Sequence, residues 1–193
     1  MQYAEIGIRF LIGTVFVVAA VGKVASERSF AAFTTSLRQL DLVPVAVARL
    51  AAVAVVTCEC VVCLLLMVPQ PRVAGIGLVG AAVLLIVFTA AIVGVVARGT
   101  QAVCRCFGGG STAPLGVRHI VRNVLLAGLA LLAARATLLQ ETGPVEPAGL
   151  VVAALAGLLV GGCVAALDEI VALFRPIDPG RPVHTAHPAR RGT

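Results

Sequence analysis

The chain consists of long apolar stretches separated by short polar segments. Five apolar stretches of about twenty residues or more lie at 6–24, 45–68, 73–97, 117–139 and 148–174. A helix of this length crosses a hydrocarbon layer that is about 30 Å thick. Membrane β-strands would instead alternate polar and apolar residues. The pattern therefore predicts an all-α polytopic membrane helical bundle with five transmembrane helices.

The segments outside these stretches have different characters. Between the first two stretches, Phe30, Phe33 and Leu37 follow a helical rhythm, and Ser26 is a candidate N-cap. We therefore expect a short helix in the 25–44 segment that lies along the membrane surface. Residues 175–193 contain Pro, Arg and His without apolar periodicity and are predicted to be a disordered basic tail.

The composition supports a membrane location. Hydrophobic residues make up 60% of the 193 residues, and charged residues make up 12%. A soluble domain has about 45–50% apolar and about 25% charged residues. Folded in water, this chain would expose a largely apolar surface. The length suits one compact helical unit.

The basic residues predict the orientation of the bundle. Twelve of the 15 Lys and Arg residues fall on the side that carries the 25–44 and 98–116 loops and the tail. The positive-inside rule makes this side cytoplasmic, so the N-terminus is expected outside and the C-terminus inside. Because these charges lie at helix ends and in the tail, the net charge of +6 does not indicate nucleic-acid binding.

The strongest candidate for chemistry is the Cys104-Arg105-Cys106 motif, which precedes a run of glycines. A thiolate is the reactive form of cysteine, and the guanidinium between the two thiols favours it. Flexible glycines ease disulfide formation and exchange with the cysteine of a partner. Metal binding with His119 as a third ligand is an alternative, but a fourth ligand is missing locally. A purely structural role is the other alternative, and we predict no metal site and no cofactor.

A second cysteine cluster lies inside the second apolar stretch, at Cys58, Cys60 and Cys63. Cys60 and Cys63 share a helix face, but their spacing of about 5–6 Å between Cβ atoms is too long for a disulfide in a regular helix. Cysteine also serves as a small hydrophobe in helix interiors. Lone Cys163 carries no functional signal.

Glu59 stands within this cluster, at a depth where a carboxylate costs at least a few kcal/mol and normally faces the bundle interior. One interpretation is a proton relay during thiol exchange. The other is an interhelical hydrogen bond or ion pair.

Several polar residues lie near the predicted cytoplasmic boundary. Lys23 ends the first stretch, and His119, Arg122 and Asn123 lie in the first turns of the fourth. Such residues commonly anchor a helix at the interface by extending their polar ends to water. Alternatively they line a polar pocket under the cysteine loop, with His119 as a base for a thiol.

Three stretches of the chain form a pattern together. The first is Arg9-Phe10-Leu11-Ile12-Gly13 through Gly22-Lys23, with the following Phe30/Phe33 segment and Leu42-Val43-Pro44. The second is Glu59, and the third is Cys104-x-Cys106-Phe107-Gly108 with Pro114-Leu115-Gly116 and Arg122-Asn123. Together they cover residues 5–139, and they resemble the methylamine utilisation protein MauE family, within the wider group of DoxX-like small membrane proteins. The cysteine motif with its downstream Arg-Asn is the most specific part of the resemblance.

The resemblance implies a four-helix MauE/DoxX-like core at residues 1–139, to which residues 140–174 add a fifth transmembrane helix. It implies a protein of the bacterial plasma membrane that helps to mature an extracytoplasmic redox client. In the family this client is the small subunit of methylamine dehydrogenase, and a thioredoxin-like protein is the partner. The resemblance nominates Cys104 and Cys106, and with them Lys23, Glu59 and the Arg122-Asn123 pair.

The predicted cytoplasmic side of Cys104 and Cys106 contrasts with an extracytoplasmic client. One hypothesis reconciles them: electrons pass from the inner dithiol through the bundle, by way of Cys60 and Cys63, to an outer thioredoxin-like protein. A component of a thiol–disulfide oxidoreductase is thus the first interpretation. A non-catalytic scaffold and a carrier of a small molecule or metal are the alternatives.

Overall fold

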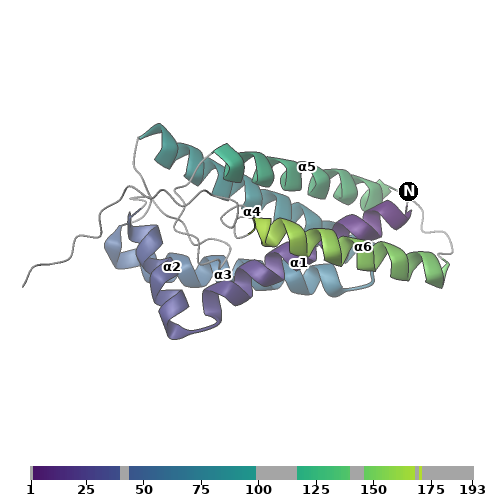
Figure 1. Ribbon diagram of the computed structural model, residues 1–193, viewed down its shortest axis with the longest axis horizontal. Helices are drawn as coiled ribbons and strands as arrows, with labels where there is room; N and C mark the ends of the chain where they lie inside the picture. Colours follow the sequence, from purple (N-terminus) through teal and green to yellow (C-terminus); the bar gives the residue numbers. More distant parts are fainter. Residues whose placement is uncertain (1, 40–43, 99–116, 140–145, 168–169, 171–193) are drawn as a thin grey trace, which may run out of the picture.

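The computed structural model describes residues 2–39, 44–98, 117–139, 146–167 and 170. Within these residues the fold consists of α-helices and one 3-10 turn (Figure 1). The helices are α1 (Gln2–Val24), α2 (Glu27–Gln39), α3 (Ala48–Met67), α4 (Pro71–Ala97), α5 (Val117–Leu139) and α6 (Pro147–Ala165), with the 3-10 turn η1 (Val45–Val47) before α3. The predicted all-α bundle is confirmed.

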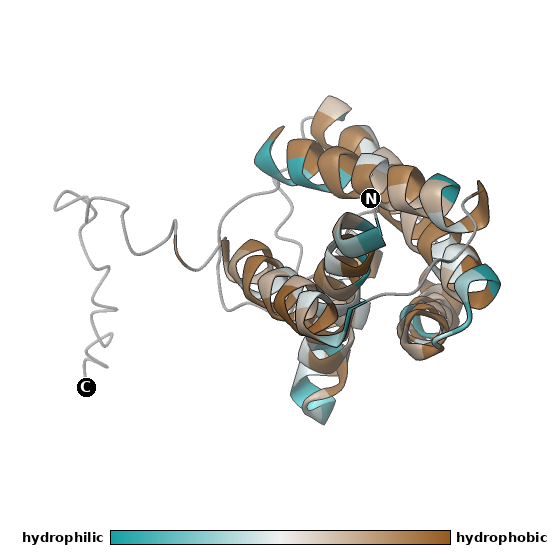
Figure 2. Ribbon diagram, turned by 90° about the vertical axis from the view of Figure 1, so that its right-hand side faces the viewer, coloured by the Kyte–Doolittle hydropathy of each residue, from teal (hydrophilic) through white to brown (hydrophobic). Residues whose placement is uncertain are grey.

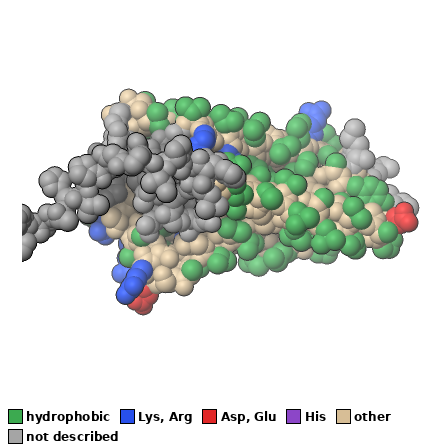
Figure 3. All heavy atoms as spheres, in the orientation of Figure 1, with side chains coloured by type: hydrophobic (Ala, Val, Ile, Leu, Met, Phe, Trp, Pro, Cys, Tyr) green, Lys and Arg blue, Asp and Glu red, His purple; other side chains and the backbone are tan. Residues whose placement is uncertain are grey.

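Five of these helical segments are long and apolar enough to cross a membrane. They coincide with the five predicted stretches, although α6 ends at Ala165 and most of the predicted span beyond it lies outside the described residues. The basic tail at 175–193 also lies outside them. Hydrophobic residues predominate in the long helices, and on the face shown in Figure 3 they cover most of the length (Figures 2 and 3). The chain is a multi-pass membrane protein.

Proline marks the start of two helices. Pro71 and Pro147 occupy the first turns of α4 and α6, where the missing N–H removes no helical hydrogen bond. Consecutive long helices run in opposite directions, so α1 and α4 end where α3 and α5 begin (Figure 1). This end also carries α2, and we call it the α2 end.

Four spans, α1, α3, α4 and α5, share one core. Small side chains are frequent in it, above all on α5, which packs closely along α4. Small residues let helix backbones approach within lipid, where no hydrophobic driving force holds helices together. The buried core residues are Ile12, Val15, Phe16, Val62, Leu66, Leu78, Ala81, Ala82, Leu85, Leu126, Ala127, Ala130, Ala133 and Ala134.

The amphipathic helix predicted in the 25–44 segment is α2. Its N-cap is the predicted Ser26, whose Oγ accepts a hydrogen bond from the backbone N–H of Ser29 at 3.1 Å. Helix α2 contacts the end of α1 and the first part of α3 (Figure 1). Phe33 is its most deeply buried large side chain, at 2% exposure, and it points into the bundle.

Helix α6 docks mainly against α1 through two glycines. A Cβ atom at Gly157 would overlap the carbonyl oxygen of Gly7, and one at Gly161 would lie 2.8 Å from the carbonyl oxygen of Leu11. The backbones of the two helices therefore meet without intervening side chains. This four-residue spacing is the geometry that small residues provide in membrane helix pairs.

This contact makes the α1–α6 interface sensitive to a single methyl group. Gly157→Ala should destabilise the protein by about 1–3 kcal/mol, because the backbone of α1 has no room to yield. Equilibrium unfolding in mixed detergent micelles measures this loss. Gly162→Ala is the matched control, since a Cβ there meets nothing within 4 Å. Equal stability of the two variants would contradict the close α1–α6 packing.

Candidate functional site

The centre of the candidate site is Lys23, in the last turn of α1. Its side chain is 0% exposed. Helical side chains point toward the N-terminus of their helix, and at the end of α1 this direction leads into the bundle. The Nζ atom accordingly donates a hydrogen bond to the carbonyl oxygen of Ala19 at 3.2 Å, one turn back along the helix. Lys23 therefore does not extend to water as an interface anchor.

Glu59 of α3 is the partner of Lys23. Its Oε1 lies 2.7 Å and its Oε2 3.0 Å from the Lys23 Nζ, and Glu59 is 1% exposed. With the Ala19 carbonyl, these two oxygens use all three N–H donors of the ammonium group. Glu59 lies 11 residues, or about 16 Å, along α3 from Ala48. Of the two interpretations of Glu59, the interhelical ion pair is the one that the structure contains.

Helix α2 completes the surroundings of this pair. The Lys23 Nζ lies 5.3 Å from the centroid of the Phe33 ring, within the range of a cation–π contact. Three helices thus meet at one ammonium group: α1 supplies the cation, α3 the carboxylate and α2 the aromatic ring. None of the three groups is in contact with water, so the charges depend on one another.

A second group of predicted residues lies on α5. Arg122 is 8% exposed and Asn123 is 0% exposed, whereas His119, one turn earlier, is partly buried. The spacing places all three on one face of the helix. Within the described parts of the chain, neither the Oδ1 nor the Nδ2 atom of Asn123 has a hydrogen-bond partner. An unpaired buried amide costs about 1–3 kcal/mol, so Asn123 is costly as a core residue, and the polar pocket around it stays a prediction.

The candidate dithiol, Cys104 and Cys106, lies outside the described residues. Its chain segment connects Arg98, the C-cap of α4, with Val117, the first residue of α5, and both are at the α2 end. Lys23, Arg122 and Asn123 are located in the helix turns nearest this end. The structure joins Lys23 directly to Glu59, and it buries Arg122 and Asn123 side by side on α5.

Cys58 and Cys60 of α3 are free thiols on the outer side of the helix, whereas the free thiol Cys63 packs against the buried core. Cys58 and Cys60 are exposed and Cys63 is partly buried, while Glu59 between them points inward. Successive residues of a helix point about 100° apart, which turns the neighbours of Glu59 away from the bundle interior. Cys163 on α6 is also free and exposed. In the hypothetical electron path, Cys60 would lie on the exposed face of α3 and Cys63 against the core of the bundle.

Sequence reasoning missed three contacts of this region. It treated Lys23 and Glu59 separately, although two opposite charges in apolar stretches are a signal for a pair. It did not place Phe33 at the ammonium. It also missed the role of Arg9, which donates hydrogen bonds from Nε and Nη2 to the carbonyl oxygens of Leu66 and Val68 at the end of α3. No local sequence pattern predicts the contact of Arg9 with the end of α3, because these residues are far apart in the chain.

Residues 1–136 match the family model of the methylamine utilisation protein MauE. The chain belongs to the MauE family. The match contains every candidate site residue and most of α5, whereas α6 lies beyond it. Comparisons with curated proteins and with solved structures found no match for this MauE-family protein.

The buried pair makes a strong prediction about stability. Glu59→Gln leaves the Lys23 ammonium without its counter-charge and should cost about 3–5 kcal/mol. The double variant K23M/E59L removes both charges and should recover much of this loss. Thermal unfolding of the detergent-purified protein, followed by circular dichroism, measures both effects.

The matched control is Glu146→Gln, which removes an exposed carboxylate at the start of α6. The midpoint of thermal unfolding of this variant should stay close to that of the unmodified protein. A Glu59→Gln variant as stable as Glu146→Gln would show that the ion pair does not stabilise the bundle.

Proposed function

We propose that this protein is the membrane component of a thiol–disulfide exchange system that matures an extracytoplasmic redox protein. The observation that carries the proposal is the Cys104-x-Cys106 motif within the MauE match, in the segment that connects α4 to α5. Membership of the family supports this role, with a thioredoxin-like protein as partner. The client in methylamine metabolism, the small subunit of methylamine dehydrogenase, is the family's example.

The proposed reaction is an exchange between a dithiol and a disulfide. A thiolate of one protein attacks a sulfur of the disulfide of the other, which forms a mixed disulfide and releases one thiolate. The second thiolate of the attacking protein then resolves the mixed disulfide. Two electrons and two protons pass from the dithiol to the disulfide, so one protein leaves oxidised and the other reduced. No further oxidant takes part in this step.

The described residues support this chemistry in separate ways. The Lys23–Glu59 pair fixes α1, α2 and α3 at the end where the cysteine segment is attached. His119, in the first turn of α5, is our candidate base for a thiol proton. Arg122 and Asn123 supply buried polar groups below it. The proton-relay role of Glu59 stays a prediction, and its pairing with Lys23 gives it a structural role in any case.

Exchange activity should depend on the dithiol. The probe is reduced thioredoxin. The purified protein, once oxidised, should oxidise thioredoxin stoichiometrically. The C104S/C106S variant should lower the rate of thioredoxin oxidation to background. Either single variant should trap a mixed disulfide, visible on a non-reducing gel. Cys163→Ser is the matched control and should retain full exchange, because this thiol is remote in the chain and lies on α6.

The alternatives differ in their results when this exchange assay is combined with an assay of client maturation. Unchanged exchange in C104S/C106S would overturn the proposed reaction. Loss of exchange together with retained maturation of the client would favour the scaffold. A loss of client maturation in C60S/C63S as well as in C104S/C106S would support electron transfer by way of α3.

The proposal includes the plasma membrane as location, with the N-terminus outside and the α2 end on the cytoplasmic side. The positive-inside rule supports this orientation. A membrane-impermeant maleimide should therefore leave Cys104 and Cys106 unlabelled in intact cells and label them after permeabilisation. A variant that retains only these two cysteines makes the readout specific. Labelling in intact cells would reverse the orientation and remove the need for a transmembrane electron path.

A further inference from the structure

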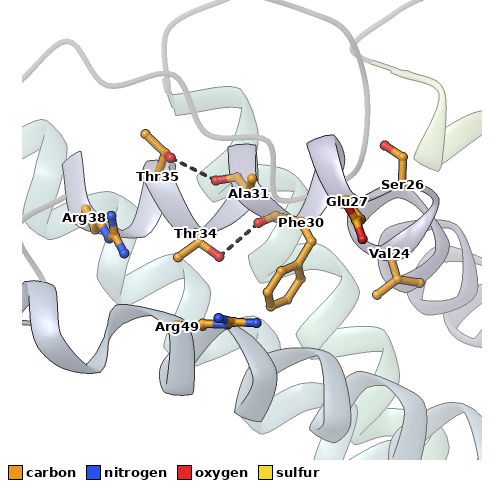
Figure 4. Close-up of a pocket in the computed structure, with 9 residues that line it drawn as sticks. All are labelled: Val24, Ser26, Glu27, Phe30, Ala31, Thr34, Thr35, Arg38 and Arg49. Carbon is orange, nitrogen blue, oxygen red and sulfur yellow. Dashed lines mark hydrogen bonds between the residues drawn. The ribbon is translucent and has the colours of Figure 1, made fainter.

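A pocket of about 680 Å³ opens at the α2 end, between α2, the end of α1 and the start of α3 (Figure 4). Its walls combine Val24 of α1, Phe30 and Thr34 of α2, and Arg49 of α3. Figure 4 shows the Phe30 ring and the Thr34 side chain directed from α2 toward Arg49. The volume is in the usual range for binding sites of small molecules, which is about 300–1,000 Å³.

The charges of the pocket favour an anion. Arg38 of α2 and Arg49 of α3 both line it, and Glu27 is the only acidic residue among the lining residues. Both guanidinium groups are exposed, and neither is paired with a carboxylate within the described residues. Their donors are therefore available to a ligand. Because they come from two different helices, one anion between them would hold α2 against α3.

The hydroxyl groups of the pocket are already used. Thr34 donates to the carbonyl oxygen of Phe30 and Thr35 to that of Ala31, each at 2.9 Å (Figure 4). The side-chain donors left for a ligand are thus mainly the two arginines. Guanidinium groups bind both carboxylate and phosphate with two parallel hydrogen bonds. A phosphate group has more acceptor oxygens than a carboxylate, so it is the better match for two arginines at once.

The surroundings of the pocket are apolar on the side of the bundle. Val21 and Val24 of α1 are 56% and 52% exposed, and Leu50, next to Arg49 on α3, is 70% exposed. These side chains belong to helices that are long and apolar enough to cross a membrane, so their exposed surface is suited to contact with lipid chains. A ligand with its phosphate on the arginines would place an attached chain along this surface. A free phosphate ion would gain nothing from it.

We propose that the pocket between α2 and α3 binds an anionic glycerophospholipid, with its phosphate on Arg38 and Arg49 and its acyl chains along Val21, Val24 and Leu50. The proposal uses no residue of the dithiol motif and does not rest on the proposed exchange reaction. Its role is to hold the amphipathic helix α2 in place over the Lys23–Glu59 pair.

Native mass spectrometry of the delipidated, detergent-purified protein tests this site with phosphatidylglycerol as the probe. One lipid should bind saturably, and R38Q/R49Q should weaken binding by about tenfold or more, since the two substitutions remove the direct hydrogen bonds of both guanidinium groups to the phosphate. Arg28→Gln is the matched control: Arg28 is exposed on the same helix but does not line the pocket. It should change the affinity by less than about twofold, because an exposed charge without a direct contact contributes little. Glu27→Gln should bind at least as tightly as the unmodified protein.

The remaining arms identify the ligand. Phosphatidylcholine should bind more weakly than phosphatidylglycerol, and inorganic phosphate or glycerol 3-phosphate should neither bind comparably nor displace the lipid. Comparable binding of these soluble phosphates would overturn the lipid assignment. An equal loss of lipid affinity in R38Q/R49Q and in Arg28→Gln would overturn the site itself. Weaker lipid binding in Glu27→Gln would do the same. Circular dichroism verifies that each variant folds, and the single variants R38Q and R49Q give the same test if the double variant does not fold.

Discussion

The buried ion pair between Lys23 and Glu59 is the constraint on which the arrangement of the first three helices depends. Neither charge contacts water, and the ammonium group has its full set of acceptors only when α1 and α3 are in one register. A shift of one residue would leave two charges uncompensated in a low-dielectric interior, where an unpaired charge is costly. The pair therefore specifies a geometry that apolar packing alone would leave degenerate. Phe33 extends this specification to α2.

Apart from this pair, the bundle depends on close contact between small residues. Alanines line the interface of α4 with α5, and glycines let the backbones of α1 and α6 meet. In lipid the apolar side chains gain little by leaving their surroundings, so dispersion and shape complementarity hold the helices together. Helix α1 is central to this packing, because it contacts every other α-helix of the described chain. The family match ends near the end of α5, and α6 is added to the matched part through this glycine contact.

Most of the buried polar side chains lie toward the α2 end of the bundle. The α2 end carries the Lys23–Glu59 pair, the buried Arg122 and Asn123, and the two helix ends that hold the cysteine segment. In the proposed function, the exchange site has to meet a soluble partner and still stay attached to the membrane. The ends of α4 and α5 fix the two points at which the cysteine segment is attached to the bundle.

The apolar pattern by itself determined the five spans, the membrane location and the amphipathic helix with Ser26 as its cap, because these follow from length, periodicity and local hydrogen bonding. The cysteine motif and Glu59 also stood out locally, since each is an exception to its surroundings. Only the tertiary structure decided which charge faces Glu59, where the Phe33 ring lies and that Arg9 binds the end of α3. Those choices join residues from different helices, and helix packing rather than local sequence sets their distances.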